Sequence, residues 1–133
     1  AICDVDKEKL AVNSKKFRVS GYTSFKEMLE KEKLDAVIIA TPTSTHSSLS
    51  LEALKAGLDI LVEKPLAPNY KAALKIAEVG EKEGRLVAVG YIERFNPAIS
   101  KLKEIKEEGK LGRLEFLDIY LHFPSILRLS QLP

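Results

Sequence analysis

The sequence has no tryptophan, one methionine and one cysteine, Cys3, among its 133 residues. A single cysteine excludes an intrachain disulfide, so we expect the protein in a reducing cytoplasm. No apolar run approaches the roughly 20 residues that a membrane-spanning helix needs, and no signal peptide is visible, so we expect no membrane association. Little cysteine and methionine beside much lysine, glutamate, isoleucine and leucine favours a thermophilic source.

Neither sign of charge dominates the sequence. The 21 basic and 19 acidic residues give a net charge of +2 and are interspersed along the chain. Nucleic-acid binding would need basic residues gathered on one face, so no nucleic-acid partner is predicted. A hydrophobic content of 45% is ordinary for a globular protein. A chain of this length buries about two-thirds of its unfolded surface on folding.

Short apolar segments alternate with segments of helical periodicity. Helix starts are predicted at polar caps, and glycines end several helices. The caps are Asp6, Thr23 or Ser24, the turn at 41–46, Asn69, and Asn96 followed by Pro97. The predicted strands cover residues 1–3, 17–19, 35–40, 59–62, 86–89 and 114–123.

This alternation predicts βαβ units and an α/β fold, an incomplete doubly wound parallel sheet of Rossmann type with the start of a second α/β domain. The segment at 36–40, Ala-Val-Ile-Ile-Ala, is apolar throughout. A continuous apolar run is typical of a central parallel strand, so we expect it to be buried on both faces. We place the partial cofactor domain at 1–112 and the second domain, or an irregular tail, at 113–133.

Polar residues follow four of the predicted strands. They are Asp4, Thr41-Pro42, Glu63-Lys64-Pro65 and Gly90-Tyr91. In open parallel sheets, ligands bind beyond the carboxyl ends of the strands. The sequence therefore predicts a site at this edge, and it predicts no metal centre.

Three motifs resemble those of one enzyme family. Ala-Thr-Pro-Thr-Ser-Thr-His at 40–46, Glu-Lys-Pro-Leu at 63–66 and Gly-Tyr-Ile-Glu-Arg-Phe-Asn-Pro at 90–97 have the order and spacing of the Gfo/Idh/MocA family of NAD(P)-dependent oxidoreductases. The likeness covers about residues 1–120 and is strongest to sugar-nucleotide 3-dehydrogenases and inositol dehydrogenases. It implies hydride transfer between a nicotinamide cofactor and a secondary alcohol of a sugar or polyol.

The resemblance assigns cofactor-binding roles in the first half of the chain. Asp4 would accept hydrogen bonds from the adenosine ribose, and the absence of an adjacent arginine favours NAD over NADP. Asp4 could equally be a turn or cap residue. Thr41 and Pro42 would lie beside the nicotinamide ribose. His46 would lie in the first turn of the next helix, where backbone donors favour an anion; an ordinary surface histidine is the alternative.

The Glu63-Lys64-Pro65 motif carries the chemistry that the resemblance implies. Glu63, Lys64 and Pro65 would contact the cofactor, and Lys64 would also reach the reacting carbon and the substrate hydroxyl. A lysine ammonium can stabilise the alkoxide that develops as an alcohol is oxidised. The alternative for Lys64 is a solvated residue after a strand.

The third motif would border the substrate cleft through Tyr91, Arg94 and Asn96. Asn96 also has a sufficient role as a helix cap. Arg94 could instead form an ion pair between domains.

The sequence also departs from the family pattern. It has no Gly-rich turn of the G-x-G-x-x-G kind. It also lacks the family's catalytic Asp and His, since the second histidine, His122, lies in a predicted strand without such a partner. One interpretation is the incomplete cofactor half of an oxidoreductase, inactive alone, with NAD(P) binding by this chain left open. The other is a non-catalytic, self-associating remnant, such as an early-terminated product.

The missing first strand would lie between the strands at 1–3 and 35–40 in the usual order. Its absence leaves a gap in the sheet or forces those two strands to pair. An exposed parallel edge invites association with another chain. We therefore expect a homo-oligomer, with a dimer as the simplest form.

Overall fold

The computed structural model describes residues 1–116. These residues fall into two compact units, one from Ala1 to Tyr91 and a second that begins at Ile92. Each unit is described by itself. Among the described residues, no helix is long and apolar enough to cross a membrane.

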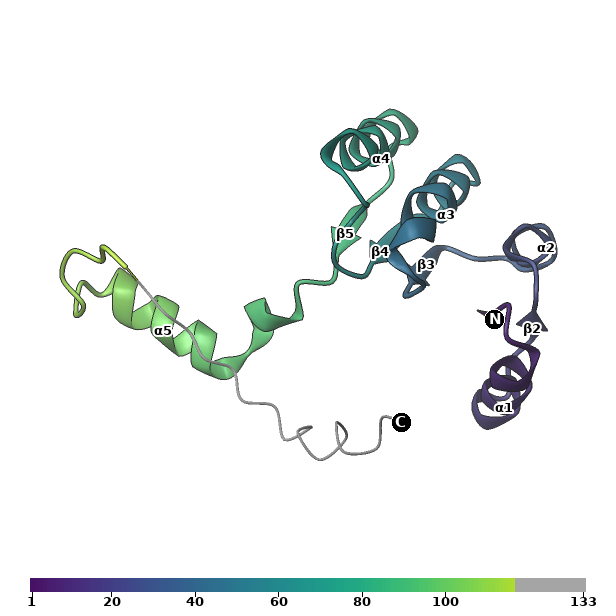
Figure 1. Ribbon diagram of the computed structural model, residues 1–133, viewed down its shortest axis with the longest axis horizontal. Helices are drawn as coiled ribbons and strands as arrows, with labels where there is room; N and C mark the ends of the chain where they lie inside the picture. The colour runs from purple at the N-terminus through teal and green to yellow at the C-terminus, as the bar shows by residue number, and fades with distance from the viewer. Residues whose placement is uncertain (117–133) are drawn as a thin grey trace, which may run out of the picture. The chain divides into compact units, whose positions relative to one another are not determined.

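The first unit alternates strands and helices along its whole length (Figure 1). Its elements are β1 (Ile2–Cys3), α1 (Lys7–Phe17), β2 (Gly21–Tyr22), α2 (Phe25–Lys31), β3 (Ala36–Ile39), α3 (Thr43–Lys55), β4 (Asp59–Val62), α4 (Tyr70–Glu83) and β5 (Val87–Val89). The second unit contains the 3₁₀ helix η1 (Ile92–Phe95) and α5 (Pro97–Glu107).

Four of the predicted helix caps are confirmed. The side chains of Asp6, Ser24, Asn69 and Asn96 each accept a hydrogen bond from a first-turn amide. Such a bond satisfies one of the amides that a helix leaves free at its start, which is why these residue types mark a helix boundary in a sequence. Gly84 ends α4 in the left-handed region at φ 63°, where glycine has no steric penalty.

All strand pairs among the described residues are parallel, as predicted, but they form two separate sheets. One sheet has the order β1-β2 and the other has the order β3-β4-β5. Within residues 1–116, β1 pairs only with β2, and β3 pairs only with β4. The first of the two expected alternatives is therefore the one found: the strands at 1–3 and 35–40 leave a gap rather than pair with each other.

The core lies between the β3-β4-β5 sheet and two helices, α3 and α4, which pack against each other and are seen side by side in Figure 1. Its fully buried side chains include Leu54 of α3, Ile60 and Val62 of β4, and Ile76 of α4. Burying a side chain of this size contributes about 1.5–3 kcal/mol. This core fixes α3, α4 and the three strands as one framework.

The prediction that the strand at 36–40 is buried on both faces is wrong for the described structure. Ile39 is buried, but Ile38, whose side chain points to the opposite face, is 70% exposed. The neighbouring Leu61, which pairs with Ile38, is 38% exposed. α3 and α4 supply apolar side chains to one face only, so the second apolar face of this strand lies open.

The predicted strand at 17–19 is also wrong. Helix α1 continues to Phe17, and Arg18 ends it in the left-handed region at φ 55°. Lys15 and Lys16 are good helix formers and continue the helix up to the start of the predicted strand. The strand that follows is instead β2, which begins at Gly21.

The end of the described chain only partly tests the prediction for a second domain. Residues 114–116 belong to the predicted strand 114–123 but are not in a strand. Residues 117–133, with His122, lie outside the described residues. The predicted boundary between 1–112 and 113–133 therefore stays a prediction.

Candidate functional site

Three of the polar segments that follow strands lie side by side at the carboxyl-terminal end of the β3-β4-β5 sheet. Ile39 pairs with Val62, and Val62 pairs with Val89, so the three strands end in register. Past these ends, the Glu63 amide donates to the Ile39 carbonyl at 2.9 Å and the Gly90 amide donates to the Val62 carbonyl at 2.8 Å. The residues that follow each strand are thereby held side by side.

Glu63 and Gly90 are in close contact at this edge. A β-carbon built on Gly90 would lie 3.4 Å from the Glu63 Cδ and Oε2 atoms. Glycine thus lets the Glu63 carboxylate lie against the end of β5. The next residue, Tyr91, is 56% exposed, and its amide donates to the Val89 carbonyl at 2.8 Å.

His46 lies in α3 and is buried, with 1% of its surface exposed. Its Nε2 is 2.8 Å from the carbonyl oxygen of Thr41, in the turn after β3. Its Nδ1 is 2.8 Å from the carbonyl oxygen of Pro65, in the loop after β4. The structure therefore places His46 in the interior, with both ring nitrogens in contact with the main chain; the alternative of an ordinary surface histidine is wrong.

Lys64 and Pro65 are exposed in the loop after β4, and the peptide bond between them is cis. The Lys64 amide donates to Oε2 of Glu63 at 3.3 Å. Ala67, two residues beyond Pro65, is buried in the core. The loop is therefore anchored at both ends, and the Lys64 side chain is left open to solvent.

The turn after β3 presents the start of α3. Pro42 is the cap residue of this helix and makes no side-chain capping bond. The Thr41 and Thr45 hydroxyl oxygens are 2.7 Å apart, and the Thr45 hydroxyl donates to the Pro42 carbonyl at 2.8 Å. First-turn amides without a side-chain cap suit a negatively charged group.

Asp4 lies at the end of β1 in the two-stranded sheet. Its carboxylate accepts the Asp6 amide at 2.9 Å, so it makes the turn contact that was the alternative to a ribose contact. Burial raises the pKa of the neighbouring Cys3 thiol, and the negative charge of Asp4 raises it further. Asp4 follows a strand of the β1-β2 sheet, whereas Thr41, Glu63 and Lys64 follow strands of the β3-β4-β5 sheet.

Arg94 and Asn96 belong to the second unit. Arg94 lies in η1 and is exposed. The Asn96 side chain accepts the Ala98 amide at 3.0 Å and donates to Oε2 of Glu93 at 3.0 Å. Asn96 thus has the capping role that the sequence also allowed.

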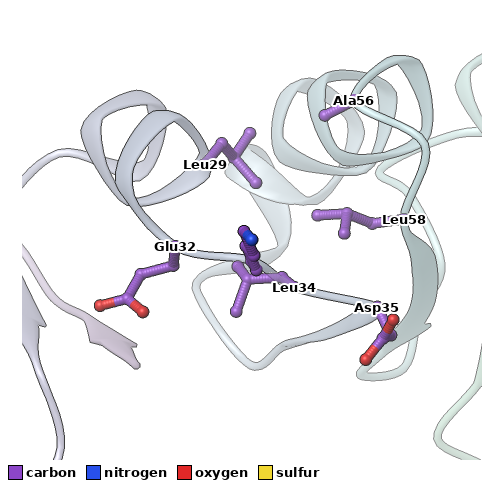
Figure 2. A pocket seen from close by; sticks show the side chains of 7 residues that line it. Leu29, Glu32, Leu34, Asp35, Ala56 and Leu58 are labelled. Atoms are coloured by element: carbon purple, nitrogen blue, oxygen red, sulfur yellow. The ribbon is translucent and has the colours of Figure 1, made fainter.

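A surface pocket lies at the amino-terminal end of the sheet, where β3 and β4 begin. It has a volume of about 360 Å³, and its lining residues include Leu34, Asp35 and Leu58 (Figure 2). Glu32, also in the lining, accepts a hydrogen bond from the Tyr22 hydroxyl at 2.8 Å. This bond raises the pKa of Tyr22, whereas bonds from Ser20 and Tyr22 lower the pKa of Glu32. The pocket is separate from the three motifs, which follow the carboxyl ends of the strands.

Among residues 1–116, no three His, Cys, Asp or Glu residues group in a way that could hold a metal ion. For a nicotinamide cofactor, the residues at the carboxyl ends fit in part. The first turn of α3 and the Glu63 carboxylate offer donors and an acceptor at the edge where parallel sheets bind dinucleotides. The described residues contain no Gly-rich turn for a pyrophosphate.

Comparisons with known proteins give relatives among the inositol dehydrogenases. Inositol 2-dehydrogenase 4 of Saccharopolyspora erythraea is 42% identical over 88 residues, which is 65% of this chain and 26% of that protein. Myo-inositol 2-dehydrogenase of Thermotoga maritima is 32% identical over 126 residues, which is 94% of this chain and 38% of that protein. The chain therefore spans well under half of either relative.

One solved structure has the same fold over most of this chain. The WlbA dehydrogenase from Bordetella pertussis, crystallised with NADH and UDP-GlcNAcA, superposes with a TM-score of 0.80 and 27% identity over 84% of this chain and 32% of that chain. Residues 1–91 match the profile of the Gfo/Idh/MocA oxidoreductase family, described as an NAD-binding Rossmann fold. The resemblance carried by the three motifs is thus confirmed, and the chain belongs to the Gfo/Idh/MocA family through its NAD-binding Rossmann domain.

Proposed function

We propose that this chain forms part of the cofactor half of an NAD(P)-dependent oxidoreductase that acts on a secondary alcohol of a sugar, sugar nucleotide or polyol. The observation that carries the proposal is that the first two motifs and the start of the third, Gly90-Tyr91, lie side by side at the carboxyl ends of β3, β4 and β5. Ligands of open parallel sheets bind at this edge. Two of the relatives are inositol dehydrogenases by name, and the WlbA structure contains a sugar nucleotide, which supports this substrate class.

In this proposal Lys64 is the catalytic residue of the chain. Oxidation of an alcohol by hydride loss also removes the hydroxyl proton, so negative charge develops on the oxygen. The bound nicotinamide supplies the hydride acceptor. An ammonium beside that oxygen stabilises its charge, and the exposed Lys64 side chain is free to reach a substrate.

The other site residues are proposed to bind the cofactor or the substrate. Glu63, with Thr41 and Pro42, contacts the nicotinamide ribose, and Pro65 contacts the cofactor beside them. Asp4 contacts the adenosine ribose and favours NAD. Tyr91, Arg94 and Asn96 border the substrate. The cytoplasmic location and the thermophilic source stay predictions from composition, and so does the inactivity of this chain without a catalytic Asp and His.

Cofactor binding can be tested directly by titrating the protein into NADH and following the nicotinamide fluorescence. We expect a saturable enhancement. Replacement of Glu63 by alanine should weaken binding about 10- to 100-fold, because a hydrogen bond to a charged group contributes about 1.5–3 kcal/mol. Glu78→Ala, at an exposed position of α4, is the matched control and should leave the affinity unchanged.

The alternative function, a non-catalytic and self-associating remnant, predicts a different titration. It predicts no saturable change at millimolar NADH, and that result would reject cofactor binding by this chain. An equal loss of affinity for NADH in Glu63→Ala and Glu78→Ala would instead contradict binding at the carboxyl ends of the strands.

Self-association is a separate part of the proposal. Within residues 1–116, β1 and β3 each pair on one side only, and Ile38 on β3 is 70% exposed. Unpaired strand edges and open apolar faces favour association with another chain. We expect a dimer by light scattering at micromolar concentration. A monomer under these conditions would contradict this part.

A further inference from the structure

His46 makes two contacts that the resemblance to the family did not predict. Its ring is 1% exposed and lies 2.8 Å from each of two carbonyl oxygens, those of Thr41 and Pro65. These oxygens belong to two different loops, and Pro65 is 19 residues away from the ring in sequence. The ring is therefore the link between the turn after β3 and the loop after β4.

The helix that carries the ring is held firmly. Ala53 and Leu54 of α3 are fully buried in the core. The loop after β4 is less constrained, since Lys64 and Pro65 are exposed. Its main chain is fixed at Glu63 by the bond to the Ile39 carbonyl and at Ala67 by burial. The contact with His46 lies between these two anchors.

Both contacts depend on the hydrogen-bonding nitrogens of the His46 ring. Carbonyl oxygens only accept hydrogen bonds, so the ring bonds to both of them only when each nitrogen carries a hydrogen. A neutral ring donates to one carbonyl and turns a lone pair to the other. In either state, an apolar side chain in place of the ring would remove the partner of main-chain acceptors in this half-buried contact.

We propose that His46 is a positioning residue, which holds the loop that carries Lys64 against the turn that carries Thr41 and Pro42. The inference rests on the proposed function for its catalytic meaning, because Lys64 directly precedes the residue whose carbonyl the ring binds. Both ring nitrogens contact the main chain, so the ring acts on Lys64 through the loop. It sets where the Lys64 main chain lies relative to the start of α3.

The experiment compares hydrogen exchange by NMR in the 133-residue chain without cofactor. His46→Phe keeps an aromatic ring and removes both nitrogens. We expect the amides of Glu63 and Lys64 to exchange about tenfold faster than global destabilisation alone explains. Leu54→Ala, on the same helix, is the matched control and should speed these amides only in step with global unfolding.

A second variant and a spectroscopic measurement separate positioning from packing. His46→Gln keeps a side-chain N–H donor for one carbonyl, so its exchange rates should lie between those of the wild type and His46→Phe. In the wild type, nitrogen spectra should show at least one ring N–H of His46 protected from solvent. Exchange at Glu63 and Lys64 that only follows global stability in both His46 variants, or a ring without a protected N–H, would overturn the proposal. Since no cofactor is present, a failed NADH titration would leave this result unaffected.

Discussion

Replacement of Ile76 by alanine should lower the free energy of unfolding by about 2–5 kcal/mol. Ile76 lies on α4, is fully buried and belongs to the core between the helices and the β3-β4-β5 sheet. The substitution removes apolar contacts and leaves a cavity that a packed interior fills only in part. The loss is a large fraction of the roughly 5–15 kcal/mol typical of a folded domain. Denaturant unfolding followed by circular dichroism measures it.

The matched control for Ile76→Ala is on the same helix. Leu74 is 43% exposed, so Leu74→Ala removes a similar side chain while leaving little or no cavity. We expect this control to cost less than about 1 kcal/mol. Equal losses for the two variants would mean that α4 does not pack against the sheet as described. Because α3 and the loop after β4 depend on the same core, Ile76→Ala should also weaken any cofactor binding.

The second large effect is expected at Gly80, where α4 approaches β5. A β-carbon at this position would lie 2.5 Å from Cγ2 of Val87. Alanine favours a helix over glycine by about 1 kcal/mol, but forcing a methyl group into a packed contact costs about 1–3 kcal/mol. The cost of the contact exceeds the gain in helix propensity, because Val87 is β-branched and held by its pairing with Ile60. Gly80→Ala should therefore destabilise the chain, by up to about 2 kcal/mol.

A double mutant tests the cause of the Gly80 effect. Val87→Ala removes the methyl group that the new β-carbon would meet, so the pair should show a coupling of about 0.5–3 kcal/mol. Gly84→Ala is the control, because Gly84 has a φ of 63° and a β-carbon there would meet nothing within 4 Å. It should lose stability through its backbone conformation, and Val87→Ala should not restore it. Absence of coupling between Gly80 and Val87 would reject the close helix–strand contact.

The candidate site was predicted in part from the sequence. Thr41, Glu63 and Tyr91 were placed at strand ends because an apolar run followed by a polar residue marks where a strand leaves the sheet. Parallel strands then bring those ends to one edge. The burial of His46 could not be predicted, since it depends on a carbonyl 19 residues away. The only signal was its place in the motif at 40–46.

What the sequence determined by itself is local. The caps at Asp6, Ser24, Asn69 and Asn96 are confirmed because a capping bond joins residues two or three positions apart. The parallel α/β class follows from the alternation of short apolar and longer amphipathic segments.

Only the tertiary structure decided how these elements are covered and joined. It separated β1-β2 from β3-β4-β5 and left Ile38 exposed on a strand whose sequence predicts burial. It also set His46 between two loops. These outcomes depend on which segments meet across long stretches of chain. An apolar pattern shows that a face can be buried, but not which other segment covers it.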